Sequence, residues 1–229
     1  MITVVVPTLN AETTLGDTLT ALVPAVVEGL VREVLIVDGG SADRTLKIAD
    51  AWGATILNTE SGRGGQLAAG ARAARGSWLL FLHADTVLEP GWTREVGHLI
   101  ERVDKGTWPP TAAAFRFALD DRGLMPRIVE AGVAMRSGLL KLPYGDQGLL
   151  LPRRLYDEVG GFAALPLMED VAIVRRLGRR RVVTLRTAAV TSAARYKRDG
   201  YAGRIARNWA CLTLYALGAS PAWLKRVYG

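Results

Sequence analysis

The sequence predicts an α/β domain built on a parallel, doubly wound sheet. Short apolar runs alternate with segments of helical periodicity over the first hundred residues, which is typical of βαβ units. Two of these runs lead directly to a carboxylate: residues 34–37 precede Asp38, and residues 78–82 stand just ahead of Asp85. Because ligands of open α/β sheets bind at the carboxyl ends of the strands, these acids indicate a site for a nucleotide, a metal ion or both.

The expected elements of the first hundred residues follow from apolar runs and turn residues. Strands are expected at residues 2–6, 33–37, 54–57 and 77–82. Asn10 and Ser41 can each cap a helix, the first running from about residue 11 with Pro24 expected to kink or end it. Further helices are expected over residues 66–75, behind a glycine-rich loop, and over residues 90–103.

Beyond residue 110 the pattern is less regular and more basic. Residues 111–119 carry Phe115 and Phe117 on one face and predict a strand. Helices are expected near residues 126–139, 154–159 and 169–177, a late strand at 181–185 and an amphipathic helix at 201–217. No repeat or linker interrupts the chain. We therefore expect a single domain over residues 1–229, with functional halves at 1–120 and 121–229.

The composition narrows the classes of function. The formal net charge of +7 favours attraction to phosphates, on small molecules or on membrane lipids. Nucleic acid is not expected as a partner, because only 7% of residues are aromatic and no basic stretch is interleaved with stacking side chains. The single cysteine, Cys211, forms neither an internal disulfide nor a thiolate metal site. We expect a cytoplasmic protein, since no signal peptide is evident and residues 209–223 are too few to span a bilayer.

The residues at the strand ends allow several roles. Asp38 could accept a hydrogen bond from a ribose or a base, or could simply close the turn over residues 38–41. Asp85 is the metal candidate, because Mg²⁺ or Mn²⁺ bound through one or two carboxylates neutralises a nucleoside diphosphate; it could also cap a turn. His83 could be a ligand, a base contact or an ordinary buried histidine. The first turn lacks the G-x-G-x-x-G pattern, which argues against NAD or FAD.

Four short motifs in order resemble the family 2 glycosyltransferases of GT-A fold. They are Pro7-Thr8-Leu9-Asn10, Val37-Asp38-Gly39-Gly40-Ser41-Ala42-Asp43, His83-Ala84-Asp85 and Glu169-Asp170. The resemblance covers most of the chain and implies a mixed, mostly parallel sheet flanked by helices. Residues 62–67, 82–86 and 144–148 are similar to those of a small subgroup associated with arsenosugar biosynthesis.

The resemblance implies that residues 1–120 bind a nucleotide-sugar donor, either a UDP- or a GDP-sugar. Asp85 would be the retained metal-binding acid of the D-x-D element, and His83 stands where most of the family has the first Asp, which leaves one carboxylate fewer for Mg²⁺ or Mn²⁺. Arg63 would lie beside the base or ribose. The full set of implied donor contacts is Pro7, Leu9, Asn10, Asp38, Arg63, Gln66, His83, Ala84 and Asp85.

The same resemblance implies that residues 121–229, with their C-terminal helices, bind the acceptor. Asp170 would deprotonate the acceptor hydroxyl and Glu169 would help to bind it, giving an inverting, metal-assisted hexosyltransferase-like reaction of class EC 2.4. The remaining implied contacts are Asp146 and Gln147 to the acceptor, and Arg195 and Lys197 to the phosphates. The acceptor would be a small molecule or a lipid-linked one.

Other interpretations stay open from the sequence alone. The basic and apolar residues beyond residue 200 could pack a terminal helix onto the domain, contact a second copy of the chain, or rest peripherally on the inner face of an anionic membrane. A nucleotidyltransferase on a related sheet is one alternative function, although residues 7–10 lack its glycine-rich basic loop. A non-catalytic nucleotide- or lipid-binding relative is another; His83 favours it, and the intact Glu169-Asp170 pair opposes it.

Overall fold

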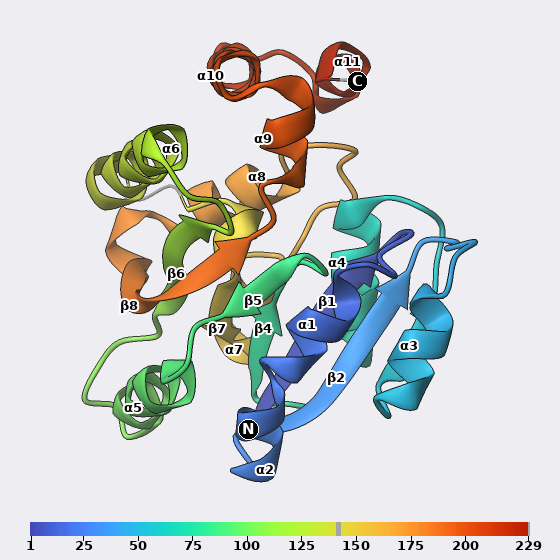
Figure 1. Cartoon of the computed structure of the whole chain (residues 1–229). Coiled ribbons are helices and arrows are strands. Elements are labelled where there is room, and N and C mark those ends of the chain that lie inside the picture. The colour runs from blue at the N-terminus through green and yellow to red at the C-terminus, as the bar shows by residue number, and fades with distance from the viewer. Residues whose placement is uncertain (141–142, 229) are drawn as a thin grey trace.

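Figure 1 shows the chain as a computed structural model, which describes residues 1–140 and 143–228. The first half alternates strands and helices in the predicted way. Its elements are β1 (Ile2–Thr8), α1 (Leu15–Thr20), α2 (Val23–Val27), β2 (Val31–Asp38), α3 (Thr45–Ala51), β3 (Thr55–Asn58), α4 (Arg63–Ala73), β4 (Trp78–Phe81), β5 (Thr86–Leu88) and α5 (Trp92–Asp104).

The second half is richer in helix. Its elements are β6 (Ala112–Leu119), α6 (Leu124–Met135) with a π-helical turn at Arg136–Leu140, a 3₁₀ turn at Gly145–Gln147, β7 (Leu149–Pro152), α7 (Arg153–Glu158), α8 (Glu169–Leu177), a 3₁₀ turn at Arg179–Arg181, β8 (Val182–Thr191), α9 (Ala194–Asp199), α10 (Tyr201–Ala216) and α11 (Pro221–Tyr228). Within the part of the chain that is described, no helix is long and apolar enough to cross a membrane.

The strands join in one sheet of order β3-β2-β1-β4-β7-β6-β8-β5. Strands β1, β2, β3 and β4 pair in parallel, as do β6 and β8. Strand β7 is antiparallel to both β4 and β6, and β5 is antiparallel to β8. The sheet is therefore mixed and mostly parallel with helices on its faces, which confirms the predicted fold class.

Two apolar layers cover the faces of the sheet. In β1 the side chains alternate with the strand period of two, so Val4 and Val6 pack toward α1, α3 and α5 while Val5 packs toward α4, α7 and α8. All three valines are completely buried. Burial on both faces explains why β1 is a continuous apolar run instead of an alternating one.

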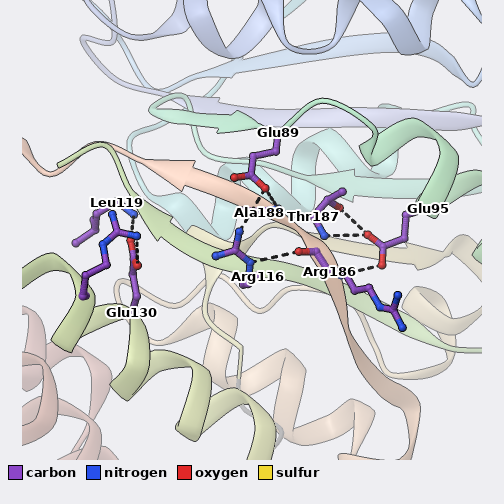
Figure 2. A network of polar contacts seen from close by, with 9 residues as sticks. Glu89, Glu95, Arg116, Leu119, Glu130, Arg186, Thr187 and Ala188 are labelled. Atoms are coloured by element: carbon purple, nitrogen blue, oxygen red, sulfur yellow. Dashed lines mark hydrogen bonds and ion pairs between the residues drawn. The ribbon is translucent and has the colours of Figure 1, made fainter. Parts of the chain in front are cut away.

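A shift in the pairing register between β6 and β8 is held by two glutamates, Glu89 and Glu95, as Figure 2 shows. The register shifts between Ala114 and Arg116, so the backbone N–H groups of Arg186 and Thr187 lie outside the regular ladder. Both donate to the Glu95 carboxylate of α5, at 2.8 and 2.9 Å. Burial alone raises the pKa of Glu95, but these hydrogen bonds outweigh it and lower the pKa below its ordinary value. The bulge thus fixes α5 against the sheet.

The turns that follow β1 and β2 bind each other instead of capping helices. Asn10 has a φ of 52° and its side-chain oxygen accepts the N–H of Ala42, while its own N–H donates to the Ser41 hydroxyl at 2.8 Å. Ser41 in turn donates to Asp38. Helix α1 begins at Leu15 and α3 at Thr45, so the predicted capping roles of Asn10 and Ser41 are wrong. Their polar atoms are already used between the two turns.

Candidate active site

A large cleft opens at the carboxyl ends of β1 and β4, with a volume of about 540 Å³. We call it the outer cleft. Its walls come from the turn after β1, the start of α4, residues 83–85 after β4, and the N-terminal parts of α8 and α9. Its volume lies in the range of small-molecule sites. Eight of the nine predicted donor contacts line it: Pro7, Leu9, Asn10, Arg63, Gln66, His83, Ala84 and Asp85.

A smaller cavity of about 140 Å³ lies behind the outer cleft, under α10. We call it the inner chamber. The two cavities share six polar side chains, namely Arg63, His83, Asp85, Glu169, Ser192 and Arg195. Asp146 and Asp170 line the inner chamber alone of the two. Asp85 and Glu169 therefore lie where two adjoining cavities join, with Asp146 and Asp170 on the inner side, which is an arrangement suited to two substrates.

Asp38 lies behind the wall of the outer cleft. Its carboxylate is 1% exposed and accepts four hydrogen bonds, from Thr8 Oγ1, the N–H groups of Gly40 and Ser41, and the Ser41 hydroxyl. Burial raises its pKa, but these bonds prevail and lower the pKa below the ordinary value. Because a carboxylate offers about four acceptor sites, this structure gives Asp38 a positioning role. Its predicted contact with a nucleoside stays a prediction.

Gln66 joins the same two strand ends from α4. Its side-chain nitrogen donates to the carbonyl oxygens of Thr8 and Val37, at 2.9 and 2.7 Å, and the residue is 4% exposed. These carbonyls close the ends of β1 and β2. Gln66 therefore fixes the floor of the outer cleft.

Arg63 begins α4 and faces both cavities. Its Nε lies 3.7 Å from Glu169 Oε1. Gly64, the next residue, allows α4 to approach the segment ahead of α8, since a Cβ there would lie within 2.4 Å of the Ala163 carbonyl oxygen. The glycine-rich loop thus has a packing reason: it brings the guanidinium of Arg63 to the acidic start of α8.

His83 lines both cavities and is held neutral. Burial, followed by the charges of Arg63 and Arg195, lowers its pKa well below 6.5. Its Nε2 lies so close to the 3₁₀ turn that a Cβ on Gly145 would come within 2.8 Å of it. His83 therefore adds no charge here and packs against the turn that carries Asp146.

Glu169 and Asp170 begin α8, as the sequence predicts. Glu169 is 3% exposed, and burial, followed by the Asp170 charge, raises its pKa to about 7 against the opposing effect of Arg63. Asp170 Oδ2 accepts the N–H of Gly145 at 2.8 Å, and Oδ1 accepts the N–H of Val171 at 2.7 Å. Each Asp170 oxygen keeps acceptor capacity for a ligand.

Among residues 1–140 and 143–228, two buried polar atoms of the inner chamber have no hydrogen-bond partner, Asp146 Oδ1 and the Tyr144 hydroxyl. Burial raises the pKa of Asp146 to about 6, helped by the charges of Asp170 and Asp85 and opposed by Arg136. Burial likewise raises the pKa of Tyr144 to about 12. Buried polar atoms are normally satisfied, so the pair indicates a place where a polar ligand completes the structure.

Gln147 faces away from both cavities. It is 1% exposed; its oxygen accepts from Ser137 and the Tyr144 N–H, and its nitrogen donates to the Phe115 carbonyl. The predicted direct contact between Gln147 and the acceptor therefore has no support in this geometry. The side chain instead anchors the 3₁₀ turn to β6, which holds Asp146 and Gly145 in place.

The two basic residues predicted to contact phosphates separate on α9. Arg195 lines both cavities, whereas Lys197 lines neither and lies 3.1 Å from Asp121 Oδ1. The segment is helical, so residues two apart point in different directions. Arg195 therefore remains the candidate for phosphate contact. The predicted phosphate contact of Lys197 is not supported, because its side chain lines neither cavity.

Several lining residues escape the sequence reasoning. Lys225 reaches the outer cleft from α11, and Ser192 lies between the cavities after β8. Arg204, Asn208 and Cys211 of α10 form the far wall of the inner chamber. Their four-residue and three-residue spacing places them on one face of a helix, which is the one signal that could have found them.

A divalent metal would rely on Asp85. In residues 1–140 and 143–228, no group of three or more His, Cys, Asp or Glu side chains is placed to hold an ion. Mg²⁺ and Mn²⁺ are often bound through one or two carboxylates together with substrate phosphates. Asp85, at the junction of the two cavities, fits that mode, with the remaining ligands supplied by a bound diphosphate and water.

Comparison with known proteins places this geometry in a class. The glycosyl transferase family 2 model matches residues 3–165. A PGL/p-HBAD biosynthesis glycosyltransferase of Mycobacterium bovis is 33% identical over 101 residues, covering 38% of this chain and 36% of that protein. The glucosyl-3-phosphoglycerate synthase of Mycolicibacterium paratuberculosis is 34% identical over 95 residues, covering 38% of this chain and 29% of that protein. The chain spans about a third of the length of these curated relatives.

Solved structures agree on the fold. The S. aureus TarS fragment 1–349 in complex with UDP has a TM-score of 0.64 at 18% identity, covering 83% of this chain and 60% of its own. Glucosyl-3-phosphoglycerate synthase from Mycobacterium tuberculosis, in complex with Mn²⁺ and UDP-glucose, has a TM-score of 0.57 at 23% identity. The match covers 84% of this chain and 69% of the synthase chain. These solved structures share the fold of this chain. The chain belongs to glycosyl transferase family 2.

Proposed function

We propose that this glycosyltransferase transfers a sugar from a UDP-sugar in the outer cleft to a hydroxyl in the inner chamber, with inversion at the anomeric carbon. One observation carries the proposal: Asp85, Glu169 and Arg63 form the shared wall of the two cavities, and Asp170 stands on the inner side of it. A donor diphosphate and an acceptor hydroxyl would then meet at that wall from opposite sides, as direct displacement requires.

The donor would lie along the carboxyl ends of β1 and β4. Pro7 and Leu9 offer apolar surface to a base, and the half-exposed side chain of Leu9 is free for such a contact. TarS has been solved with UDP, and the mycobacterial synthase with UDP-glucose and Mn²⁺, which supports a uridine donor here. Arg63 and Arg195 bring two positive charges to the same cleft, where they favour a diphosphate.

Asp85 would hold the divalent ion against the donor diphosphate. When bound, Mg²⁺ or Mn²⁺ stabilises the negative charge that develops on the leaving phosphate. The replacement of the first D-x-D acid by a neutral His83 leaves Asp85 with one charged partner fewer for the metal, so we expect weak metal binding without the nucleotide. Arg63 and Arg195 would share in the stabilisation of the leaving group.

Asp170 would accept the proton of the acceptor hydroxyl. The acceptor oxygen forms a bond to the anomeric carbon, the bond from that carbon to the diphosphate oxygen breaks, and the proton passes to the Asp170 carboxylate. The Gly145 and Val171 N–H groups fix that carboxylate in place. Direct attack from the face opposite the leaving group inverts the configuration, and the carboxylate needs no covalent role.

Glu169 and Asp146 would act as hydrogen-bond partners of the acceptor. Their raised pKa values, about 7 and about 6, make both acids able to carry a proton near neutral pH, so each could donate to a substrate oxygen. The partnerless oxygens of Asp146 and Tyr144 support a small-molecule or lipid-linked acceptor with several hydroxyls. An acceptor from arsenosugar biosynthesis stays a prediction of the resemblance.

Thermal shift with nucleotide sugars tests the proposal. A ligand that binds the native state raises its melting temperature by mass action. UDP-glucose and related UDP-sugars should raise it with Mn²⁺ present, and GDP-, ADP- and CMP-sugars should do so less. A protein that no UDP-sugar stabilises, with or without Mn²⁺, would contradict the assignment of the outer cleft to a uridine donor.

A further inference from the structure

Helix α10 exposes small and apolar residues and keeps both of its arginines from full exposure. Its arginines, Arg204 and Arg207, bond to Asp199 at 3.2 and 2.9 Å beneath the helix. The exposed residues of the helix carry no charge at all. They are Ala202, Gly203, Ala206, Trp209, Ala210, Thr213 and Ala216, continued by Leu217. A surface helix normally presents charged and polar residues on its exposed side.

The two helices beside α10 continue this apolar surface. Helix α6 contacts α10, and α10 contacts α11; α10 and α11 lie together at the top of Figure 1, with α6 at the upper left. Trp209 and Trp223 are each 46% exposed. We call the following residues the apolar face: Leu124, Met125, Ile128, Met135, Trp209, Leu217 and Trp223. An exposed apolar set of this size on contacting helices indicates an interaction site.

The charges near the apolar face are mostly positive. Its flanks carry the exposed Arg122, Arg127 and Arg226, together with Lys225. Glu130 is the sole acid in the sequence between residues 122 and 140, and residues 200–228 contain none. That glutamate pairs with Arg127, and its side chain is only 11% exposed. An apolar surface with tryptophans and a rim in which Arg122, Lys225 and Arg226 outnumber the acids fits the interface of an anionic bilayer.

We propose that the apolar face docks this protein on an anionic membrane surface. A second copy of the chain is the weaker occupant, because a two-fold contact through this face would set the same positive rims against each other. The inner face of α10 lines the inner chamber through Asn208 and Cys211, so docking places that chamber about one helix diameter, roughly 10 Å, from the bilayer. Resting on the proposed function, this makes the acceptor a lipid-linked hydroxyl.

Vesicle sedimentation of the whole chain tests the docking without any substrate. The protein should bind vesicles of phosphatidylcholine with roughly 30% phosphatidylglycerol and should fail to bind phosphatidylcholine alone. The double variant W209S/W223S should lose about tenfold or more in partition coefficient. The matched control is Trp52→Ser, since Trp52 is 44% exposed at the end of α3, which packs on β3 and α1, and this variant should bind as the parent does. The charge variant R122Q/R226Q should lose about 25-fold.

The outcomes separate docking from the enzymatic proposal. Unchanged binding by W209S/W223S, or no binding of the parent chain to anionic vesicles, overturns the inference. A dimer in light scattering that W209S/W223S dissociates, with no vesicle binding, also overturns it and assigns the face to a second copy. UDP-sugar thermal shifts of the same variants report the donor site separately, so vesicle binding without any donor response would refute the proposed function alone.

Discussion

The substitution Asp170→Asn separates proton transfer from folding. In the parent chain Asp170 accepts N–H groups from Gly145 and Val171, at 2.8 and 2.7 Å. An asparagine oxygen can keep one of these bonds and its NH₂ group loses the other, which costs about 1 kcal/mol of stability. Loss of a general base typically lowers the rate by about 10² to 10⁴, or about 3 to 5 kcal/mol in activation free energy. The expected loss of turnover therefore far exceeds what misfolding could explain.

The assay follows UDP release from a UDP-sugar with a hydroxyl acceptor, beside a calorimetric titration of UDP. Asp170→Asn should lower kcat by at least about 100-fold while the dissociation constant for UDP changes by less than about threefold. Asp50→Asn, an exposed carboxyl of α3 away from both cavities, is the matched control and should keep full activity. A variant at position 170 with turnover within about threefold of the parent would refute the role of Asp170 as base.

Three further changes test the site. The pKa of Glu169 is raised from 4.5 to about 7, so its contribution to the free energy of unfolding is present below pH 4.5 and is lost as the pH rises through 7. Urea unfolding between these pH values should show a steeper fall in the free energy of unfolding for the parent than for Glu169→Gln. Gly145→Ala forces a Cβ to 2.8 Å from His83 Nε2 and should destabilise the fold by about 1 to 3 kcal/mol and impair turnover. The control Gly97→Ala, in α5, places its Cβ in open space and should leave activity unchanged. Equal behaviour of the two variants would contradict the close contact between Gly145 and His83. Gln147→Leu leaves the buried Phe115 carbonyl and the Tyr144 N–H without partners, so thermal denaturation should show a loss of about 3 kcal/mol, and a loss below about 0.5 kcal/mol would mean that the turn is held otherwise.

The sequence predicted the elements that deliver the acids. Apolar strands followed by Asp38 and Asp85, and the helix beginning at Glu169, are set by local patterns that need no tertiary information. Strand β8 was expected to end at residue 185 and runs to Thr191, because the glutamate-held bulge lets the strand continue past its apolar part. Strand β5, of three residues, is too short to leave a periodic signal.

The sequence could not separate side chains that line the cavities from those that support them. Asp38, Gln66 and Gln147 are typical ligand-binding residue types, yet each spends its polar atoms on backbone or turn groups of its own chain. Thr8 lies 30 positions along the chain from Asp38 and 58 from Gln66, and Ser137 lies 10 from Gln147, so the spacing of residues in the sequence does not reveal these hydrogen bonds. Lys225 shows the reverse case: it reaches the outer cleft from the last helix, far along the chain from the other donor residues.

Calorimetric titration of UDP with Mn²⁺ into the parent chain and Asp85→Asn measures most directly whether a metal-assisted donor site lies at the junction of the two cavities. The parent should bind UDP at least about tenfold more tightly with Mn²⁺ than with a chelator, and Asp85→Asn should lose that difference while keeping its metal-free affinity. Equal enhancement by Mn²⁺ in both proteins, or no UDP binding by either, would contradict the placement of the donor diphosphate beside Asp85.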